Sequence, residues 1–238
     1  MSKKLRIGII GTGGIAGPHM AAYKQFDNVE VVGGADIVPG KAKAFFEKWD
    51  VPDAQAFESA EELIKNVKMD GVSVCTYNTT HAECTIAALE AGLHVQCEKP
   101  MSFTLQEAVD MVKASKKAGK ILTIGFQPRY SYIRKKVDHM IESGAIGKVY
   151  YIQSGGGRRR GIPGGTFVDA EKAGFGCLGD IGCYSIDECL HAVKYPRPLT
   201  VSAVATDYFG KNLKYWSDAD SFNVDDFSVA FVRLEGDI

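Results

Sequence analysis

The stretch Leu5-Arg6-Ile7-Gly8-Ile9-Ile10-Gly11-Thr12-Gly13-Gly14-Ile15-Ala16 decides the fold of this chain. Its first half is a near-continuous apolar run, which is typical of a strand buried on both faces of a parallel sheet. Its second half matches the pattern G-x-G-x-x-G/A, in which Gly11 permits a tight turn, Gly13 lets the backbone approach a pyrophosphate, and Ala16 lets a helix pack closely on the strand. A plain tight turn is the alternative, so the surrounding sequence has to decide between the two.

The surrounding sequence alternates short apolar runs with helical patterns as far as residue 126. Such an alternation predicts βαβ units and a doubly wound parallel sheet, whose ligand crevice lies at the carboxyl ends of the strands. Two capping boxes, Ser59 with Glu62 and Thr104 with Glu107, predict helix starts. The further strands are expected at residues 29–35, 72–75 and 121–124.

The pattern changes after Gln127-Pro128. A helix is expected over residues 131–143 and a strand over 149–154, and two long strand-like stretches, 200–209 and 224–234, have no helix between them. This is typical of an α+β domain with a largely antiparallel sheet. We therefore expect a dinucleotide-binding Rossmann domain over residues 1–126 and an α+β substrate and oligomerisation domain over residues 127–238.

Composition excludes several classes of protein. The formal net charge is -1 and the charges are mixed along the chain, which gives no electrostatic footprint for nucleic acid or an anionic membrane. No segment approaches the roughly 18 apolar residues of a membrane span, so a cytoplasmic protein is expected. The six cysteines form no C-x-x-C pair and are expected to be reduced, and no metal site is predicted.

Asp36 lies 25 residues after Gly11, at the end of the second predicted strand. An acid at this place is expected to accept hydrogen bonds from an adenosine ribose. The alternative is a helix N-cap ahead of Pro39. Because Ile37 rather than an arginine follows, the sequence favours NAD over NADP, although Lys41 and Lys43 leave NADP open.

A lysine-containing segment, Cys97-Glu98-Lys99-Pro100-Met101, lies between an apolar strand and the next helix. An alcohol loses a hydride easily only as its proton leaves, so a group that holds that proton is needed near the carbinol. Lysine, with an ordinary pKa of about 10.4, suits this role once burial or a nearby positive charge lowers its pKa. Pro100 stiffens the backbone and can adopt the cis form. The alternative is a surface lysine at a helix start.

Several motifs, in this order, resemble the GFO/IDH/MocA oxidoreductases, the glucose-fructose oxidoreductase and inositol dehydrogenase family. The resemblance covers residues 1–130 and returns at residues 176–187. The motifs are Gly11 to Ala16 with His19, Cys75-Thr76-Tyr77-Asn78-Thr79-Thr80-His81, Ala87-Ala88-Leu89-Glu90-Ala91-Gly92, Glu98-Lys99-Pro100, and Gly176 to Asp187.

The resemblance implies a Rossmann domain, an open-faced sheet that usually mediates homo-oligomers, and hydride exchange between NAD(P) and a carbinol of a sugar, polyol or cyclitol. Family patterns show T-P-N where this chain has Thr76-Tyr77-Asn78, so Tyr77 is expected to change the loop. The cofactor-binding residues implied are Gly11, Thr12, Gly13, Gly14, Ile15, Asp36, Ile37, Thr76, Asn78, His81, Glu98, Lys99 and Gln127.

The second motif has tyrosine, Tyr184, where the family usually has histidine, four residues after Asp180. On a helix this spacing places both side chains on one face. The resemblance then implies a catalytic set of Lys99, Asp180 and Tyr184, in which the lysine and the tyrosine form a coupled acid-base unit. The alternative is a helix N-cap aspartate above a core tyrosine. His191 is expected to pair with Asp187.

Substrate recognition is expected from Lys99, Arg129, Arg158, Asp180 and Tyr184. The loop Arg158-Arg159-Arg160 either binds a carboxylate or phosphate of the substrate or is a solvated or oligomer-contact loop. Family members are commonly longer, so the second domain is expected to lack later strands. Two other functions stay open: an NAD-dependent glycosidase that uses transient oxidation, and a dinucleotide-binding module without turnover.

Overall fold

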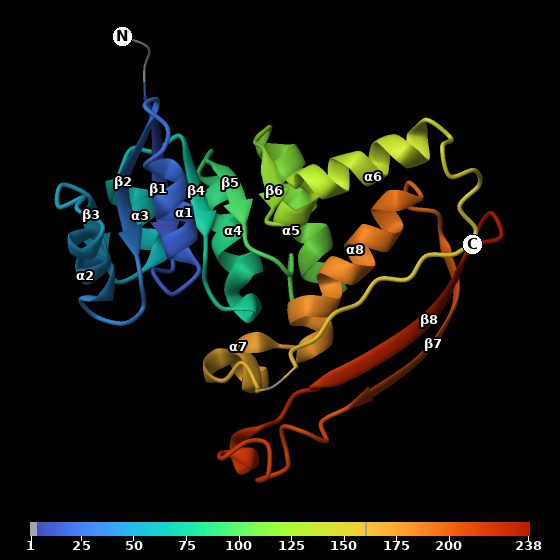
Figure 1. Ribbon diagram of the computed structural model, residues 1–238. Coiled ribbons are helices and arrows are strands. Elements are labelled where there is room, and N and C mark those ends of the chain that lie inside the picture. The colour runs from blue at the N-terminus through green and yellow to red at the C-terminus, as the bar shows by residue number, and fades with distance from the viewer. Residues whose placement is uncertain (1–3, 160) are drawn as a thin grey trace. The chain divides into compact units, whose positions relative to one another are not determined.

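The computed structural model describes residues 4–159 and 161–238, which form two compact units that divide between Gly125 and Phe126 (Figure 1). The first unit holds a six-stranded sheet in the order β3-β2-β1-β4-β5-β6, with every neighbouring pair parallel. This confirms the predicted doubly wound sheet. The strands are β1 (Leu5–Ile10), β2 (Val29–Ala35), β3 (Gln55–Phe57), β4 (Gly71–Val74), β5 (His94–Cys97) and β6 (Leu122–Ile124).

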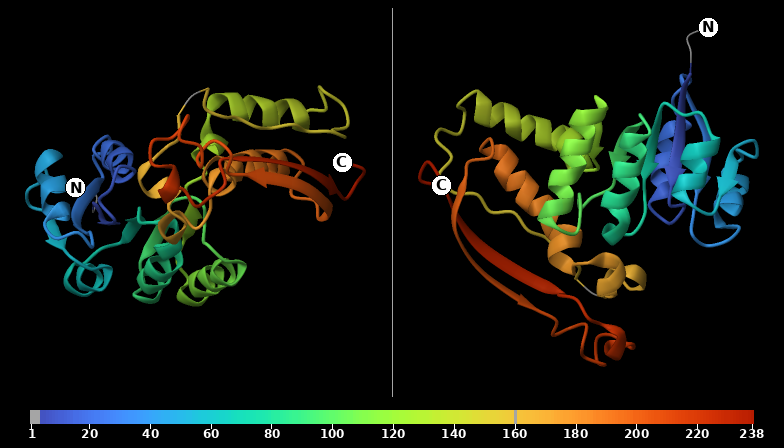
Figure 2. Two further views of the ribbon diagram at one scale, coloured as in Figure 1. Left: turned by 90° about the horizontal axis from the view of Figure 1, so that it is seen from below. Right: turned by 180° about the vertical axis from the view of Figure 1, so that it is seen from behind.

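Helices cover both faces of this sheet (Figures 1 and 2). On one face, Ile9 and Val31 pack against Met20 and Phe46 of the first two helices. On the other face the remaining helices supply buried side chains such as Leu63, Leu89 and Met111 to a larger cluster. The helices are α1 (Ala16–Tyr23), α2 (Lys41–Lys48), α3 (Ala60–Asn66), α4 (His81–Glu90) and α5 (Leu105–Ala118).

The helix starts follow from local side-chain hydrogen bonds. Thr104 and Glu107 form the predicted reciprocal capping box at the start of α5. At the start of α3, Ser59 Oγ accepts a hydrogen bond from the Glu62 amide at 3.1 Å. Each bond satisfies a backbone amide that has no partner within the helix.

The second unit combines helices with a two-stranded antiparallel sheet, as predicted for an α+β domain. Its helices are α6 (Tyr132–Glu142), α7 (Ala170–Ala173) and α8 (Cys183–Ala192), with a π-helical turn over Leu178–Gly182 just before α8. Its strands are β7 (Pro198–Thr206) and β8 (Phe227–Leu234), which form the long ribbon in Figures 1 and 2. Short 3₁₀ turns occur in this unit at Gln127–Tyr130, Gly165–Val168 and Ala219–Ser221, and in the first unit at Asn78–Thr80.

The predicted strand over residues 149–154 is wrong, because this segment has no regular secondary structure. Its β-branched and aromatic residues are typical of a strand, but a strand needs a partner to satisfy its backbone groups. Tyr150 and Tyr151 are both exposed. Apolar side chains are also exposed along the ribbon of β7 and β8, including Val201, Val204 and Phe231.

Gly11 and Gly13 provide a test of the turn after β1. Gly11 has φ +86°, and a Cβ there would lie 2.6 Å from the Cys75 carbonyl oxygen, whereas a Cβ at Gly13 would meet nothing within 4 Å. Gly11→Ala is therefore expected to lower the free energy of unfolding by about 2 kcal/mol or more, and Gly13→Ala by less than about 1 kcal/mol. Urea denaturation measures both variants, and equal losses would contradict this account of the turn.

Candidate cofactor and catalytic site

The glycine turn is fixed between two neighbouring strands. The Gly11 amide donates to the Ala35 carbonyl at the end of β2 (2.8 Å), and the Cys75 amide after β4 donates to the Ile10 carbonyl (2.7 Å). After Gly11 there is free space beside the backbone, because a Cβ at Gly13 or Gly14 would have no protein atom within 4 Å. The turn therefore leaves room for a pyrophosphate against its backbone, as the dinucleotide interpretation requires.

Asp36 ties the end of β2 to the glycine turn. Its Oδ2 accepts hydrogen bonds from the Thr12 amide and hydroxyl, both at 2.9 Å, and pairs with the Lys41 ammonium at 2.9 Å. Burial opposes ionisation, but hydrogen bonds from the Val38 amide, Lys41 and Thr12 outweigh it and lower the pKa of Asp36. The N-cap alternative is excluded, because Gly40 caps α2.

Residues 76–81 form the loop after β4 and the start of α4. Thr76 and Thr80 each donate a side-chain hydrogen bond to the Tyr77 carbonyl (3.3 and 3.0 Å), which fixes the loop at the place where the family pattern has proline. Asn78 begins the 3₁₀ turn of this loop. His81 is buried and its Nδ1 contacts the Pro100 carbonyl at 2.8 Å, so its ring lies against the lysine-containing turn.

The lysine-containing turn directly follows β5. Glu98 is buried, and its Oε1 lies 2.7 Å from His19 Nε2. The Lys99 amide donates to Glu98 Oε2 at 3.3 Å, and the Lys99–Pro100 bond is cis. Lys99 itself is half-buried. The glycine turn, Asp36, the Thr76 loop and Lys99 thus follow four strands, β1, β2, β4 and β5, at one edge of the sheet.

The predicted site residues of the second unit include Gln127 and Arg129, both in the 3₁₀ turn over Gln127–Tyr130. The Arg129 guanidinium binds both carboxylate oxygens of Asp187, with Nε to Oδ2 at 2.8 Å, and contacts the Tyr195 hydroxyl. The expected pair between Asp187 and His191 is wrong. Asp187 is held by Arg129 instead, and His191 Nε2 lies 3.4 Å from an oxygen of Asp138 on α6.

Asp180 lies within the π-helical turn and Tyr184 in the first turn of α8. The residues at the start of these helices are Cys177 and Gly182, so Asp180 is not the N-cap that the alternative required. The Tyr184 ring packs edge-on against Phe126, with centroids 6.0 Å apart. Arg158 and Arg159 are exposed, and Arg160 lies outside the described residues.

Sequence reasoning missed an aspartate that fixes the second motif. Asp225 accepts hydrogen bonds from the amides of Gly176 and Leu178, both at 3.0 Å, and contacts the Cys177 thiol. Burial chiefly raises the pKa of this thiol, to about 11. Sequence reasoning also missed Ser73 and Tyr23, which join His19 in a buried network with Glu98. Polar residues inside apolar segments were the available signal for both.

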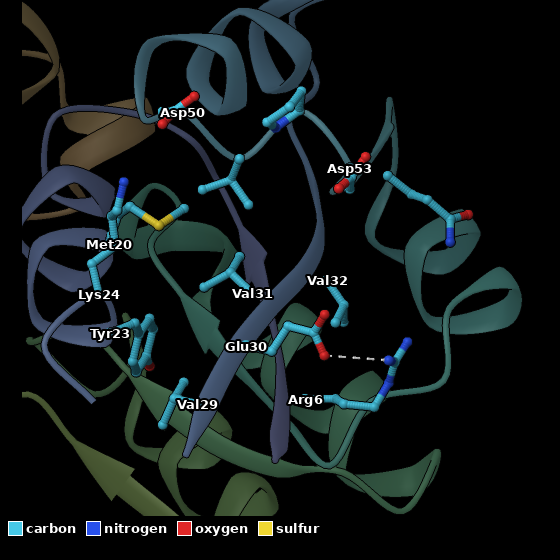
Figure 3. A pocket seen from close by; sticks show the side chains of 13 residues that line it. Arg6, Met20, Tyr23, Lys24, Val29, Glu30, Val31, Val32, Asp50 and Asp53 are labelled. Carbon is cyan, nitrogen blue, oxygen red and sulfur yellow. Dashed lines mark ion pairs between the residues drawn. The ribbon is translucent and has the colours of Figure 1, made fainter. Parts of the chain in front are cut away.

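A cavity of about 460 Å³ lies elsewhere in the first unit, at the amino ends of β1, β2 and β3 (Figure 3). Among the charged side chains that line it, Arg6 pairs with Glu30 at 3.6 Å, and the Lys24 ammonium donates to the Trp49 carbonyl at 2.8 Å. Ligands of doubly wound sheets bind at the carboxyl ends, so this cavity is not the cofactor site.

Among the described residues, no helix is both long and apolar enough to cross a membrane. The same residues contain no cluster of three or more histidine, cysteine, aspartate or glutamate side chains that would hold a metal ion. All six cysteines are free thiols.

Comparison with known proteins gives several relatives. D-glucoside 3-dehydrogenase of Escherichia coli is 34% identical over 204 residues, which cover 85% of this chain and 58% of that protein. Myo-inositol 2-dehydrogenase of Thermotoga maritima is 35% identical over 149 residues, or 63% of this chain and 44% of that protein. This chain thus spans about half the length of these curated relatives.

A solved structure gives the same result for the fold. Aldose-aldose oxidoreductase from Caulobacter crescentus, crystallised with glycerol, superposes with a TM-score of 0.83 at 29% identity, covering 98% of this chain and 68% of that one.

Two family models match the chain in succession. The model of the oxidoreductase family with an NAD-binding Rossmann fold matches residues 5–126, and that of the family's C-terminal domain matches residues 135–238. These matches confirm the resemblance and the NAD cofactor that the glycine turn predicted. The chain therefore belongs to the GFO/IDH/MocA family of oxidoreductases.

Proposed function

We propose that this chain catalyses the NAD(P)-dependent oxidation of a carbinol, or the reverse reduction of a carbonyl, in a sugar, polyol or cyclitol. The observation that carries the proposal is the place of Lys99. Its turn follows β5 at the same edge of the parallel sheet where the glycine turn follows β1. An acid-base group is thereby presented at the edge where ligands of such sheets bind.

The chain's own residues would hold the cofactor through backbone and carboxylate contacts. The open backbone at Gly13 and Gly14 suits a pyrophosphate, and the ionised Asp36 suits a ribose hydroxyl. Lys41 beside Asp36 partly offsets the negative charge that would repel a 2'-phosphate, so NADP stays possible beside NAD. When bound, the nicotinamide supplies the two-electron acceptor. Gly11, Thr12, Ile15, Ile37, Thr76, Asn78, Lys99 and Gln127 complete the proposed cofactor-binding set. The buried Glu98 and His81 are proposed to act on the cofactor site indirectly, by holding the lysine-containing turn.

The proton of the alcohol hydroxyl has to be accepted by a side chain of the protein. We assign this proton transfer to Lys99. Tyr184 is proposed as a second acid-base group, and Asp180 as the residue that orients the substrate hydroxyl. A tyrosine with an ordinary pKa near 10 needs a cation close by to act at neutral pH, which is why the two groups are proposed as one unit.

The relatives support the class of substrate. Two act, by their names, on a glucoside and on myo-inositol, which share secondary hydroxyls on a six-membered ring. Arg158 is exposed and remains a proposed substrate contact. Arg129 already binds both carboxylate oxygens of Asp187 through Nε and Nη2, so its proposed role is to hold α8 rather than to bind substrate directly.

Lys99→Met keeps the length of the side chain and removes the ammonium. We expect kcat/KM to fall by about 10²- to 10⁴-fold, because the alcohol proton loses its acceptor, while the Kd for NAD changes by less than about fivefold. NADH formation over a panel of sugars and cyclitols, with calorimetry for NAD, measures both. Lys113→Met, at an exposed lysine of α5, is the control.

The same panel separates the other functions. Cleavage of glycosides without accumulation of NADH would indicate a glycosidase, and NAD binding without turnover would indicate a binding module. A Lys99→Met variant with the parent's kcat/KM would overturn the role given to Lys99.

Tyr184→Phe removes the hydroxyl and keeps the ring that packs against Phe126. We expect kcat/KM to fall by about tenfold or more and its pH profile to change, because one of two coupled acid-base groups is gone. The measurement is kcat/KM against pH for the variant beside the parent. An unchanged profile would exclude Tyr184 as a proton donor.

Asp36→Asn tests the ionised carboxylate. The pKa of Asp36 is lower in the folded chain than its ordinary value of about 3.9, so its stabilising effect is complete above pH 4 and is lost as the pH falls through the folded pKa. The parent is expected to be the more stable at pH 7, and the difference should shrink toward pH 3. Urea denaturation at several pH values measures this, and a pH-independent difference would contradict it.

A further inference from the structure

Two buried histidines contact the lysine-containing turn, one on each side of Lys99. His19 on α1 places Nε2 2.7 Å from Oε1 of Glu98, the residue before the lysine. His81 at the start of α4 places Nδ1 2.8 Å from the carbonyl oxygen of Pro100, the residue after it. The two rings are 8% and 1% exposed, so both contacts are shielded from water.

The Glu98 carboxylate has little freedom to move. One oxygen meets His19, and the other accepts a hydrogen bond from the backbone amide of Lys99 itself at 3.3 Å. Gly125, at the end of β6, packs so closely that a Cβ there would lie 3.0 Å from Glu98 Oε1. The histidine therefore acts on the lysine backbone through one fixed carboxylate.

His19 is itself held by a chain of hydroxyl groups. Its Nδ1 lies 3.0 Å from Ser73 Oγ on β4, and the Tyr23 hydroxyl lies 2.5 Å from the same oxygen. Burial raises the pKa of Tyr23, so this tyrosine keeps its proton and can donate it to Ser73. Ser73 then donates to His19 Nδ1, and His19 Nε2 donates to Glu98. With these donors every group in the chain has a hydrogen-bond partner.

His81 contacts the turn at Pro100, the residue that follows the lysine. Burial lowers the pKa of His81, which keeps its imidazole neutral at neutral pH. A neutral ring has one N–H, and the Thr76 backbone is a second acceptor for this ring. We assign the N–H to Nδ1 because this nitrogen lies 2.8 Å from the Pro100 carbonyl oxygen.

We propose that His19 and His81 are positioning residues that fix the backbone of Lys99 from both sides through donors at different ring nitrogens, Nε2 in His19 and Nδ1 in His81. The inference rests on the proposed function, in which Lys99 carries the acid-base step. A proton acceptor misplaced by about 1 Å costs on the order of 10²-fold in rate, so the turn has to be held from more than one direction.

The difference between the nitrogens gives a matched test. A glutamine amide nitrogen imitates Nε2 and an asparagine amide nitrogen imitates Nδ1. His19→Gln and His81→Asn therefore keep each donor in place, whereas the swapped variants His19→Asn and His81→Gln keep a polar side chain of similar size with the donor misplaced. We expect the matched variants to keep kcat within about threefold of the parent, and the swapped variants to lose about 10- to 100-fold with the Kd for NAD within about threefold.

A second measurement needs no turnover. Hydrogen exchange of the Lys99 amide in the protein without cofactor is expected to be about tenfold faster in the swapped variants than in the parent, and near the parent rate in the matched ones. If the parent turns over no substrate, the proposed function fails. The exchange rates of the Lys99 amide still show whether His19 and His81 fix the backbone of Lys99. Equal behaviour of matched and swapped variants, whether all resemble the parent or all are impaired, would overturn the proposal.

Discussion

The close approach of Gly11 to the Cys75 carbonyl is the constraint on which the candidate site depends. Backbone hydrogen bonds from β1 to both neighbouring strands bring the first glycine so near to the end of β4 that no side chain fits there. A larger residue would separate the strand ends and shift everything that follows them. The glycine turn, the Thr76 loop and, one strand further, the lysine-containing turn share this edge because the strands are parallel.

Buried polar groups hold this edge in one arrangement. Asp36, His19, Glu98 and His81 are all buried, and hydrogen bonds connect them to segments far away in the sequence. A buried polar group without a partner costs about 1–3 kcal/mol, so an alternative arrangement that breaks these bonds is strongly disfavoured. Because these buried polar groups need their hydrogen bonds, they hold the carboxyl ends of the strands and the turns that follow them in one conformation.

The sequence predicts the first unit better than the second, for a physical reason. Strands buried on both faces give apolar runs, and caps such as Thr104 act within one turn of a helix, so both signals are local. The failures concern choices between distant partners. Residues 149–154 have the pattern of a strand but lack a neighbouring strand, and Asp187 binds Arg129 although His191 stands one helical turn away. Spacing along the chain carries no information on such choices.

The second motif divides its aspartates between two tasks. Both oxygens of Asp187 are engaged by the Arg129 guanidinium, and the start of the motif is held by a third aspartate, Asp225, outside it. A carboxylate bound bidentately to an arginine is a poor ligand for a substrate hydroxyl, since its lone pairs already meet strong donors. We therefore assign to Asp187 and Asp225 the work of fixing the helix. Asp180, whose role in orienting the substrate is a proposal, lies in the π-helical turn just before α8. Single π-helical turns are frequent at functional sites because they redirect side chains that an α-helix would place elsewhere.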